Sequence, residues 1–467
     1  MKTPAEVEAH FKEHGQEHVL QFVPDLSDAD KKALFDQLAS VELEKIPPIA
    51  ELEATLKKQE EESASQTIAP LTERVAYSSD AAMVQKVEPL GLEAIAQGQV
   101  AALVLAGGQG TRLGFDHPKG MYNIGLPSGR TLFQMIVERL LRLKHLTKAD
   151  KNVPLYVMTS PINHEETVTF FESNNCFGME RADIFFFQQG VLPCFGKDNK
   201  IIMETTSKIA VAPDGNGGIY PSLSKSGALA DMDKRGLKYL HVFAIDNSLV
   251  KPADPRFLGY CISEQADCGN KVCWKTNAHE KVGVVAARDG RPCVIEYSEI
   301  TKEMAEQEDG NGRLVFGAGN ICNHYYTLDF IKEKILPNFG NLYHLAHKKI
   351  PYYDHEKKET VTPTANNGIK LETFIFDVFP LSKRMAIWDV SRAEEFAPVK
   401  NAPGSPSDSP DTARAAISNL AKAWVEVAGG KVTGNSDQNE ISPLTSFAGE
   451  GLEELVKDKE FSAPFSL

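Results

Sequence analysis

The chain has 467 residues, 42% hydrophobic and 24% charged, a composition typical of a soluble globular protein. This length exceeds one ordinary hydrophobic core, so two or three domains are expected. The formal net charge of -14 argues against a nucleic-acid-binding surface and requires any phosphate site to be locally basic.

Targeting signals and cysteine usage indicate the cellular compartment in which the protein is expected. The longest apolar runs fall short of the ~18 residues of a membrane span, and residues 1–5 lead into charged sequence, so we expect no membrane span and no signal peptide. The seven cysteines are scattered without C-x-x-C pairs, which argues against a disulfide framework or a zinc site. We therefore expect free thiols and a cytoplasmic location.

Residues 1–95 are rich in Glu, Lys, Ala and Leu and are expected to form a helical N-terminal domain. Ser27 stands three residues before Asp30, as in a helix-capping box, and Leu34 and Leu38 follow at helical spacing. The charged run at residues 57–62 is typical of a solvated helix face.

From residue 96 the pattern changes to short apolar runs separated by helical stretches. The predicted strands are residues 100–106, 155–159, 184–187, 239–245, 282–287 and 294–297. This alternation predicts an α/β catalytic domain over residues 96–392, with a Rossmann-like, doubly wound and mostly parallel sheet. Ligands of such sheets bind at the carboxyl ends of the strands.

A glycine-rich turn, AGGQGTRLGFDHPKG at residues 106–120, follows the first of these strands. Gly107 and Gly108 allow a tight turn that brings backbone N–H groups against an anion. Arg112 and Lys119, two isolated cations, lie seven residues apart in the same segment. Glycines alone are equally consistent with an ordinary strand-to-helix turn, but the two cations favour a phosphate site.

Two better-known phosphate loops do not fit the spacing. A Walker A loop needs Lys-Ser or Lys-Thr directly after the glycines, and neither is present. The dinucleotide fingerprint needs a third glycine at Leu113 when it is counted from Gly108 and Gly110. Both classes are therefore excluded for this turn.

The last part of the chain, residues 393–467, is expected to form a C-terminal domain. NAPGSPSDSPD at residues 401–411 is rich in Pro and Ser and predicts an exposed linker. Residues 412–427 carry apolar side chains on one side and stop at Gly429, which predicts a helix.

These motifs resemble a known family. LAGGQGTRLG followed by PKG resembles the signature of nucleotidyltransferases that make NDP-sugars, and the continuation GMYNIGLPSGRTLFQ is similar to the eukaryotic UDP-N-acetylglucosamine pyrophosphorylases. The resemblance covers about residues 95 to 455. Further matching segments, in chain order, are FFQQGVLP, APDGNGG, AIDN, VIEYSEI, GAGNICNH, NGIKLETFIFDVF and EEFAPVKNA. It implies a β-rich C-terminal lobe and Mg²⁺-assisted formation of UDP-N-acetylglucosamine and pyrophosphate from UTP and N-acetylglucosamine 1-phosphate.

Phosphate chemistry of this kind needs cations and a metal more than a general base, because the attacking sugar phosphate is already ionised. Arg112 offers a bidentate fork to phosphates and Lys119 a point charge. The resemblance adds Lys400, reaching across from the other lobe, and the backbone of Leu105 beside the glycines. Asp246 follows a buried strand and suits Mg²⁺, although an Asp that caps the next turn would have the same sequence position.

Base and sugar recognition are expected from other strand ends. The Gln189 amide can pair with the uracil edge, and Gly215 can present bare backbone beside it. The resemblance implies that the sugar is lined by Asn216, Gly283, Glu296, Tyr297 and Asn320. Phe374 and Phe376 could add an apolar wall, although alternating aromatics are also typical of ordinary strand core.

Alternatives to this function remain at this point. A UDP-glucose or broad UDP-sugar pyrophosphorylase would use the same phosphate chemistry, but related glucose enzymes typically carry Pro-Pro-Gly-His-Gly where this chain has APDGNGG. The galactosamine epimer differs by only one hydroxyl. A nucleotide-sugar-binding regulator on the same fold is the non-enzymatic alternative. We expect no nucleic-acid or membrane partner, and a monomer or weak homodimer.

Overall fold

The computed structural model describes residues 3–63 and 66–467 and divides the chain into two compact units. Unit 1 comprises Met1–Thr67, Gln189–Pro221 and Leu336–Val378, and unit 2 comprises Ile68–Gln188, Ser222–Ile335 and Phe379–Leu467. Both units are discontinuous in sequence, so they do not follow the domain boundaries at residues 95 and 392 expected from composition. Packing between distant segments defines the units, and composition does not register such packing.

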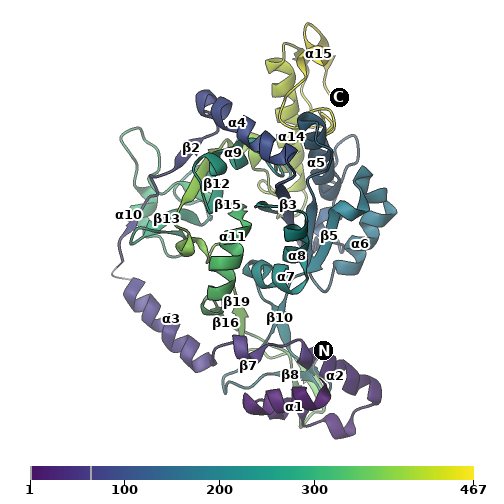
Figure 1. The fold of residues 1–467 in the computed structure, drawn as a ribbon, viewed down its shortest axis with the longest axis vertical. Helices are drawn as coiled ribbons and strands as arrows, with labels where there is room; N and C mark the ends of the chain where they lie inside the picture. The colour runs from purple at the N-terminus through teal and green to yellow at the C-terminus, as the bar shows by residue number, and fades with distance from the viewer. Residues whose placement is uncertain (1–2, 64–65) are drawn as a thin grey trace. The chain divides into compact units, whose positions relative to one another are not determined.

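Unit 2 is built on an 11-stranded sheet (Figure 1). In spatial order its main path is β2 (Val75–Tyr77), β20 (Met385–Val390), β12 (Cys268–Trp274), β15 (Ala318–Thr327), β11 (Tyr239–Ala244), β3 (Val100–Leu105), β4 (Leu155–Thr159) and β5 (Ile184–Gln188). Neighbouring strands on this path are parallel except where β15 pairs antiparallel with β11 and β12. The predicted α/β class with a mostly parallel sheet is confirmed.

An antiparallel extension branches from β15. It contains β13 (Val284–Arg288), β14 (Arg291–Ile295) and β1 (Ile68–Ala69). A strand was predicted at residues 294–297, but β14 ends at Ile295, so Glu296 and Tyr297 lie outside the observed strand.

The core of unit 2 lies between the sheet and its helices. Ala102, Val104, Leu155 and Val157, alternate residues of β3 and β4, share one apolar cluster with α4 (Ala81–Ala96), α5 (Leu132–Thr147) and α9 (Pro255–Ser263). Almost every residue of β3 and β4 is buried, as expected for parallel strands covered on both faces. The remaining helices of this unit are α6 (His164–Ser173), α8 (Ala228–Lys234), α10 (Lys302–Glu306), α11 (Leu328–Phe330), α13 (Arg392–Glu395), α14 (Pro410–Val427) and α15 (Glu453–Val456).

Five strands of the sheet were not predicted: the short β1 and β2, and the longer β12, β15 and β20. Polar side chains interrupt the apolar pattern of two of them, with Lys271 in the middle of β12 and Asn323 and His324 in β15, and all three are buried. The partners of Lys271 and Asn323 come from distant parts of the chain, so a window on the sequence does not show how these polar groups are satisfied.

Unit 1 combines helices with small sheets. The predicted helices are present as α1 (Pro4–Glu13), α2 (Asp28–Ala39) and α3 (Ile49–Ser63), and the Ser27 hydroxyl caps α2 by accepting from Asp30 N at 3.1 Å. Buried residues of α1 and α2 share a core with Leu371, which lies in a strand far along the chain. The strands are β6 (Val191–Pro193) with β10 (Val211–Pro213), β7 (Phe195–Gly196) with β19 (Gly368–Glu372) and β16 (His344–Lys348), β8 (Met203–Thr205) with β9 (Lys208–Ile209), and β17 (Tyr352–Asp354) with β18 (Glu359–Val361). The short α12 (Leu336–Asn338) also falls here, and α7 (Ile219–Lys225) spans the unit boundary.

The C-terminal segment is more helical than expected. The predicted helix is present as α14, with a capping box at Ser409, so it begins inside the stretch expected to be a linker. The only described strands after residue 400 are β21 (Lys431–Thr433) and β22 (Glu460–Ser462). In residues 431–467, the part expected to be β-rich, β21 pairs with β22, and the described helix there is the short α15.

Two further observations concern the whole described chain. All seven cysteines are free, five of them buried and two half-buried, as predicted. Among residues 3–63 and 66–467, no helix combines the length and the apolar character needed to cross a membrane.

Candidate functional site

The glycine turn begins where β3 ends, at Leu105, and folds back on itself. Lys119 N donates to Gly108 O at 3.1 Å, which closes the turn and sets Lys119 beside the glycines. An ideal Cβ on Gly110 would lie 2.7 Å from Phe115 O, so a side chain there would displace the backbone. The compact shape of this turn therefore requires glycine at position 110.

A buried asparagine holds this loop. Asn163, which follows β4, is fully buried, and its amide nitrogen donates to Ala106 O at 3.0 Å and Gly108 O at 3.4 Å. Its own carbonyl oxygen accepts from Ser160 N at 2.8 Å. Asn163 fixes the carbonyls on either side of Gly107 and so orients the turn. Sequence reasoning missed it, although its place just after the neighbouring strand was an available signal.

Asp246 lies at the same edge of the sheet as the turn. Strand β11 is the parallel neighbour of β3, with Ala244 in register with Leu105, and Ile245 N donates to Leu105 O at 3.2 Å. Asp246 is the next residue and is half-buried. The carboxylate therefore follows a buried strand directly beside the glycine turn.

Asn247 ties the chain near Lys400 to this edge. Its amide nitrogen donates to Glu395 O at 2.7 Å, and its amide oxygen accepts from Ala397 N at 3.0 Å. The Asn247 side chain is thus occupied with backbone, which places the segment before Lys400 against the strand end.

Two further hydrogen bonds tie Val399, the residue before Lys400, to the backbone of Asp246 and to the side chain of Lys119. Val399 N donates to Asp246 O at 2.8 Å, and Lys119 Nζ donates to Val399 O at 3.2 Å. Lys400, the next residue, is exposed. Although Lys400 was expected to reach across from another lobe, it belongs to the same compact unit as the glycine turn.

The electrostatics agree with this grouping. Burial lowers the pKa of Lys119, Asp246 raises it, and the Lys400 and Arg112 charges lower it. Burial also raises the pKa of Cys322 to about 12, with Asp246 raising and Lys400 lowering it. Arg112, Asp246 and Lys400 therefore form one charge cluster with Lys119. That this cluster binds phosphate stays a prediction.

A buried ion group supports the cluster from within unit 2. Lys271 is fully buried, with its Nζ 2.5 Å from Asp254 Oδ2 and in contact with a carboxylate oxygen of Glu395. Lys251 Nζ lies 3.3 Å from the other Glu395 oxygen. Burial alone would raise the pKa of Asp254, but Lys271 and Lys251 lower it to about 2. Sequence reasoning missed this group, and the lysine inside an apolar strand was its one signal.

Three of the predicted sugar residues also come together in unit 2. Asn320 N donates to Gly283 O at 2.8 Å, and an ideal Cβ on Gly283 would lie 3.1 Å from Glu296 Oε1. Asn320 Oδ1 accepts from Asn270 Nδ2 at 3.3 Å. Tyr297 follows Glu296 on the surface and is 51% exposed. Gly283, Glu296 and Asn320 therefore cluster, whereas Tyr297 projects from the exposed loop after β14.

The remaining predicted residues belong to unit 1. Gly215 has φ 83°, and an ideal Cβ on it would lie 2.3 Å from Thr373 O. Asn216 Oδ1 accepts from Ile375 N at 3.0 Å. The rings of Phe374 and Phe376 stack with centroids 5.3 Å apart and lie on a turn, half-buried, so they are not ordinary strand core. The loop at residues 214–216 and the turn at 373–376 thus form one substructure.

Gln189 is the first residue after β5 and is half-buried. Its position at a strand end is as predicted. Gln189 also begins the second segment of unit 1. The predicted nucleotide and sugar residues are accordingly distributed over both units.

The chain is similar to known nucleotidyltransferases. The sequence profile of the family described as UTP–glucose-1-phosphate uridylyltransferase matches residues 50–407. "UDP-N-acetylhexosamine pyrophosphorylase-like protein 1" of Xenopus tropicalis is 43% identical over 98% of this chain and 95% of that protein. The Saccharomyces cerevisiae UDP-N-acetylglucosamine pyrophosphorylase is 45% identical over 80% of this chain and 79% of that protein. The crystal structure of the Trypanosoma brucei uridine diphosphate N-acetylglucosamine pyrophosphorylase has a TM-score of 0.81 and 32% identity, covering 94% of this chain and 92% of that one.

Proposed function

Because the chain belongs to the UTP–glucose-1-phosphate uridylyltransferase family, we propose that it makes UDP-N-acetylglucosamine and pyrophosphate from UTP and N-acetylglucosamine 1-phosphate. The charge cluster of Arg112, Lys119, Asp246 and Lys400 carries this function, because it concentrates cations at one strand edge of a chain with net charge -14. Relatives named for UDP-N-acetylglucosamine, at 40 to 45% identity, favour the amino sugar over glucose.

The reaction balances without a general base. An ionised oxygen of the sugar phosphate attacks the α-phosphorus of UTP, the new O–P bond forms, and the bond to the β-phosphate breaks, so pyrophosphate leaves with the electron pair. Arg112 and Lys119 neutralise the triphosphate, and Lys400 screens the charge that builds as two phosphates converge. The glycine turn, held by Asn163, presents backbone N–H groups to the same anion.

A magnesium ion fits the residues present. Asp246 offers a half-buried carboxylate next to the glycine turn, whereas the Asn247 amide is already occupied by backbone. One protein carboxylate suffices for an ion that keeps several waters and shares phosphate oxygens. When bound, Mg²⁺ would neutralise phosphate charge at this position. We propose Asp246 as its ligand in this chain.

Base and sugar are assigned to separate groups of residues. Gln189 and the Gly215 backbone read the uracil edge, and Asn216 with the stacked rings of Phe374 and Phe376 receives the acetamide. Glu296 and Asn320 accept hydroxyl hydrogen bonds, with Gly283 and Tyr297 beside them. The 4-hydroxyl epimer, an N-acetylgalactosamine phosphate, is a plausible second substrate under this assignment.

A substrate panel tests this function. The purified chain is given UTP with N-acetylglucosamine 1-phosphate, its galactosamine epimer or glucose 1-phosphate, with Mg²⁺ present or chelated, and pyrophosphate release is measured. We expect the acetylated sugars to be preferred and activity to require the metal. A clear preference for glucose 1-phosphate would support the UDP-glucose alternative, and binding of UDP-sugar without turnover would support the regulator.

We also propose that the protein is cytoplasmic and is a monomer or weak homodimer. Seven free cysteines are consistent with a reducing compartment. Sedimentation of the full chain over a range of concentrations tests the oligomeric state, and a tight oligomer would contradict it.

A further inference from the structure

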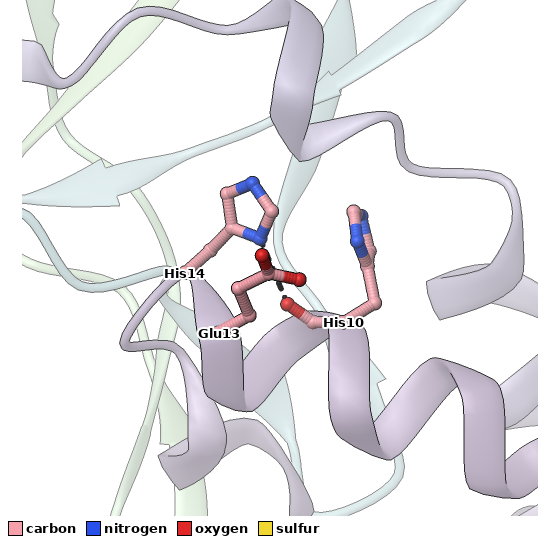
Figure 2. Close-up of side chains that lie close together, drawn as sticks. All are labelled: His10, Glu13 and His14. Atoms are coloured by element: carbon pink, nitrogen blue, oxygen red, sulfur yellow. Dashed lines mark hydrogen bonds between the residues drawn. The ribbon is translucent and has the colours of Figure 1, made fainter.

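Helix α1 (Pro4–Glu13) packs an apolar face in the core of unit 1 and carries a polar face beside it. Val7 and Phe11 are buried in that core. His10, Glu13 and His14 follow at the i, i+3 and i+4 positions, which places them on one side of the final turn (Figure 2). None of these three residues has a role in the uridylyl transfer described above.

Their side chains converge on a small volume. One nitrogen from each histidine and one carboxylate oxygen from Glu13 all lie within 4.8 Å of one another. The ring centroids of His10 and His14 are 4.6 Å apart. Figure 2 shows the Glu13 carboxylate extending toward the two imidazole rings from the same helical turn. This is the spacing with which two histidines four residues apart hold zinc in helical metal sites.

Polar contacts already orient both rings. His14 Nδ1, the ring nitrogen that faces Glu13 in Figure 2, lies 2.8 Å from His10 O, and a bound ion replaces this hydrogen bond. His10 Nε2 lies 3.2 Å from Glu44 Oε2, and the His10 side chain is only 14% exposed. Histidines that bind metals typically have such a carboxylate partner, because it fixes the ring and its tautomer.

We propose that His10, Glu13 and His14 bind one divalent transition-metal ion of the zinc class. Two imidazole nitrogens and one carboxylate suit Zn²⁺, Ni²⁺ or Cu²⁺, whereas Mg²⁺ and Ca²⁺ prefer oxygen ligands alone. Water completes the coordination. Because α1 packs in the core of unit 1, an ion bound to its last turn stabilises this unit relative to the unfolded chain.

The experiment uses the full chain without an affinity tag, stripped with a chelator and dialysed. Zn²⁺ is titrated by calorimetry and Co²⁺ by absorption spectroscopy, in the presence of excess Mg²⁺ so that oxygen sites are already filled. We expect one ion per chain at this site and a rise in thermal midpoint with Zn²⁺.

Matched variants locate the ion. Glu13→Gln and His14→Gln should each weaken Zn²⁺ binding by about tenfold or more and remove the thermal shift, while transferase activity stays unchanged. His279→Gln is the control, because His279 is 77% exposed and lies 3.8 Å from a carboxylate of Glu306. Glu13 is exposed, so its replacement leaves the core intact even where a histidine change perturbs the helix. Equal Zn²⁺ affinity in wild type, Glu13→Gln and His14→Gln would overturn the site.

Discussion

The phosphate and sugar regions of unit 2 are supported differently. The charge cluster sits at the ends of the adjacent strands β3 and β11 and is held by two buried asparagines, Asn163 and Asn247, and by the ion group around Lys271. The residues after β14 lie on the antiparallel extension, where Tyr297 is 51% exposed. Charges that must converge on reacting phosphates require a rigid support. The residues proposed to bind the sugar include Tyr297 on a more exposed loop. We therefore expect phosphate-region changes to affect all substrates and sugar-region changes to alter selectivity.

The greatest effect on the proposed phosphate region should be the loss of stability on changing the buried ion group beneath it. Lys271→Met leaves Asp254 buried without its ion-pair partner and Glu395 with Lys251 alone, which should destabilise the fold by about 3–5 kcal/mol. Urea unfolding followed by circular dichroism measures this loss.

Lys332→Met is the matched control for Lys271→Met. Lys332 pairs with Asp233 at 2.9 Å near the surface of the same unit, so its loss should cost at most about 1 kcal/mol. Equal losses in the two variants would show that the buried ion group contributes no special support.

Removal of a phosphate-binding cation tests the cluster itself. Lys119→Ala should lower the rate of pyrophosphate release by about 10²–10³-fold while the protein stays folded, since one fixed charge is lost from the transition state. Asp246→Ala should have an effect of similar size, and a near-normal rate in both variants would refute the assignment of the cluster.

Low pH should weaken the same buried support. Burial, assisted by the Lys271 charge, lowers the pKa of His241 to about 4, and its Nδ1 accepts from Ala253 N at 2.8 Å. The unfolded chain binds a proton near pH 6.5 that the folded chain takes up only near pH 4. This stabilisation is complete above about pH 6.5 and is lost as pH falls toward 4, by at most about 3 kcal/mol. His241→Gln should flatten this part of the stability profile; an unchanged slope would contradict it.

The sugar region should give the smallest effect and the one most dependent on substrate. Glu296→Gln keeps the shape of the side chain but removes a charged acceptor, so kcat/KM for the acetylated sugar phosphate should fall by about tenfold. KM for UTP should not change. A loss of UTP binding would place Glu296 in the phosphate region instead.

Local signals made half of this site predictable. The glycine turn and Asp246 each follow a mostly apolar strand, Arg112 and Lys119 lie in the turn segment, and the structure places them at one sheet edge. A strand end followed by glycines or a carboxylate is visible in a few consecutive residues.

The supports of the site were not predictable in the same way. Lys271 meets Glu395 across 124 positions of sequence, and Asn163 meets Ala106 across 57. Nothing near either residue in the chain shows its partner. The division into two units was not predicted for the same reason. The N-terminal helices share their core with Leu371, which is far away in the sequence.

The selectivity ratio tests the central comparison most directly. It is the kcat/KM for N-acetylglucosamine 1-phosphate divided by that for glucose 1-phosphate, measured in wild type, Lys119→Ala and Glu296→Gln. We predict that Lys119→Ala lowers both values together and leaves the ratio unchanged, whereas Glu296→Gln changes it. A ratio that shifts in Lys119→Ala and stays constant in Glu296→Gln would contradict the account.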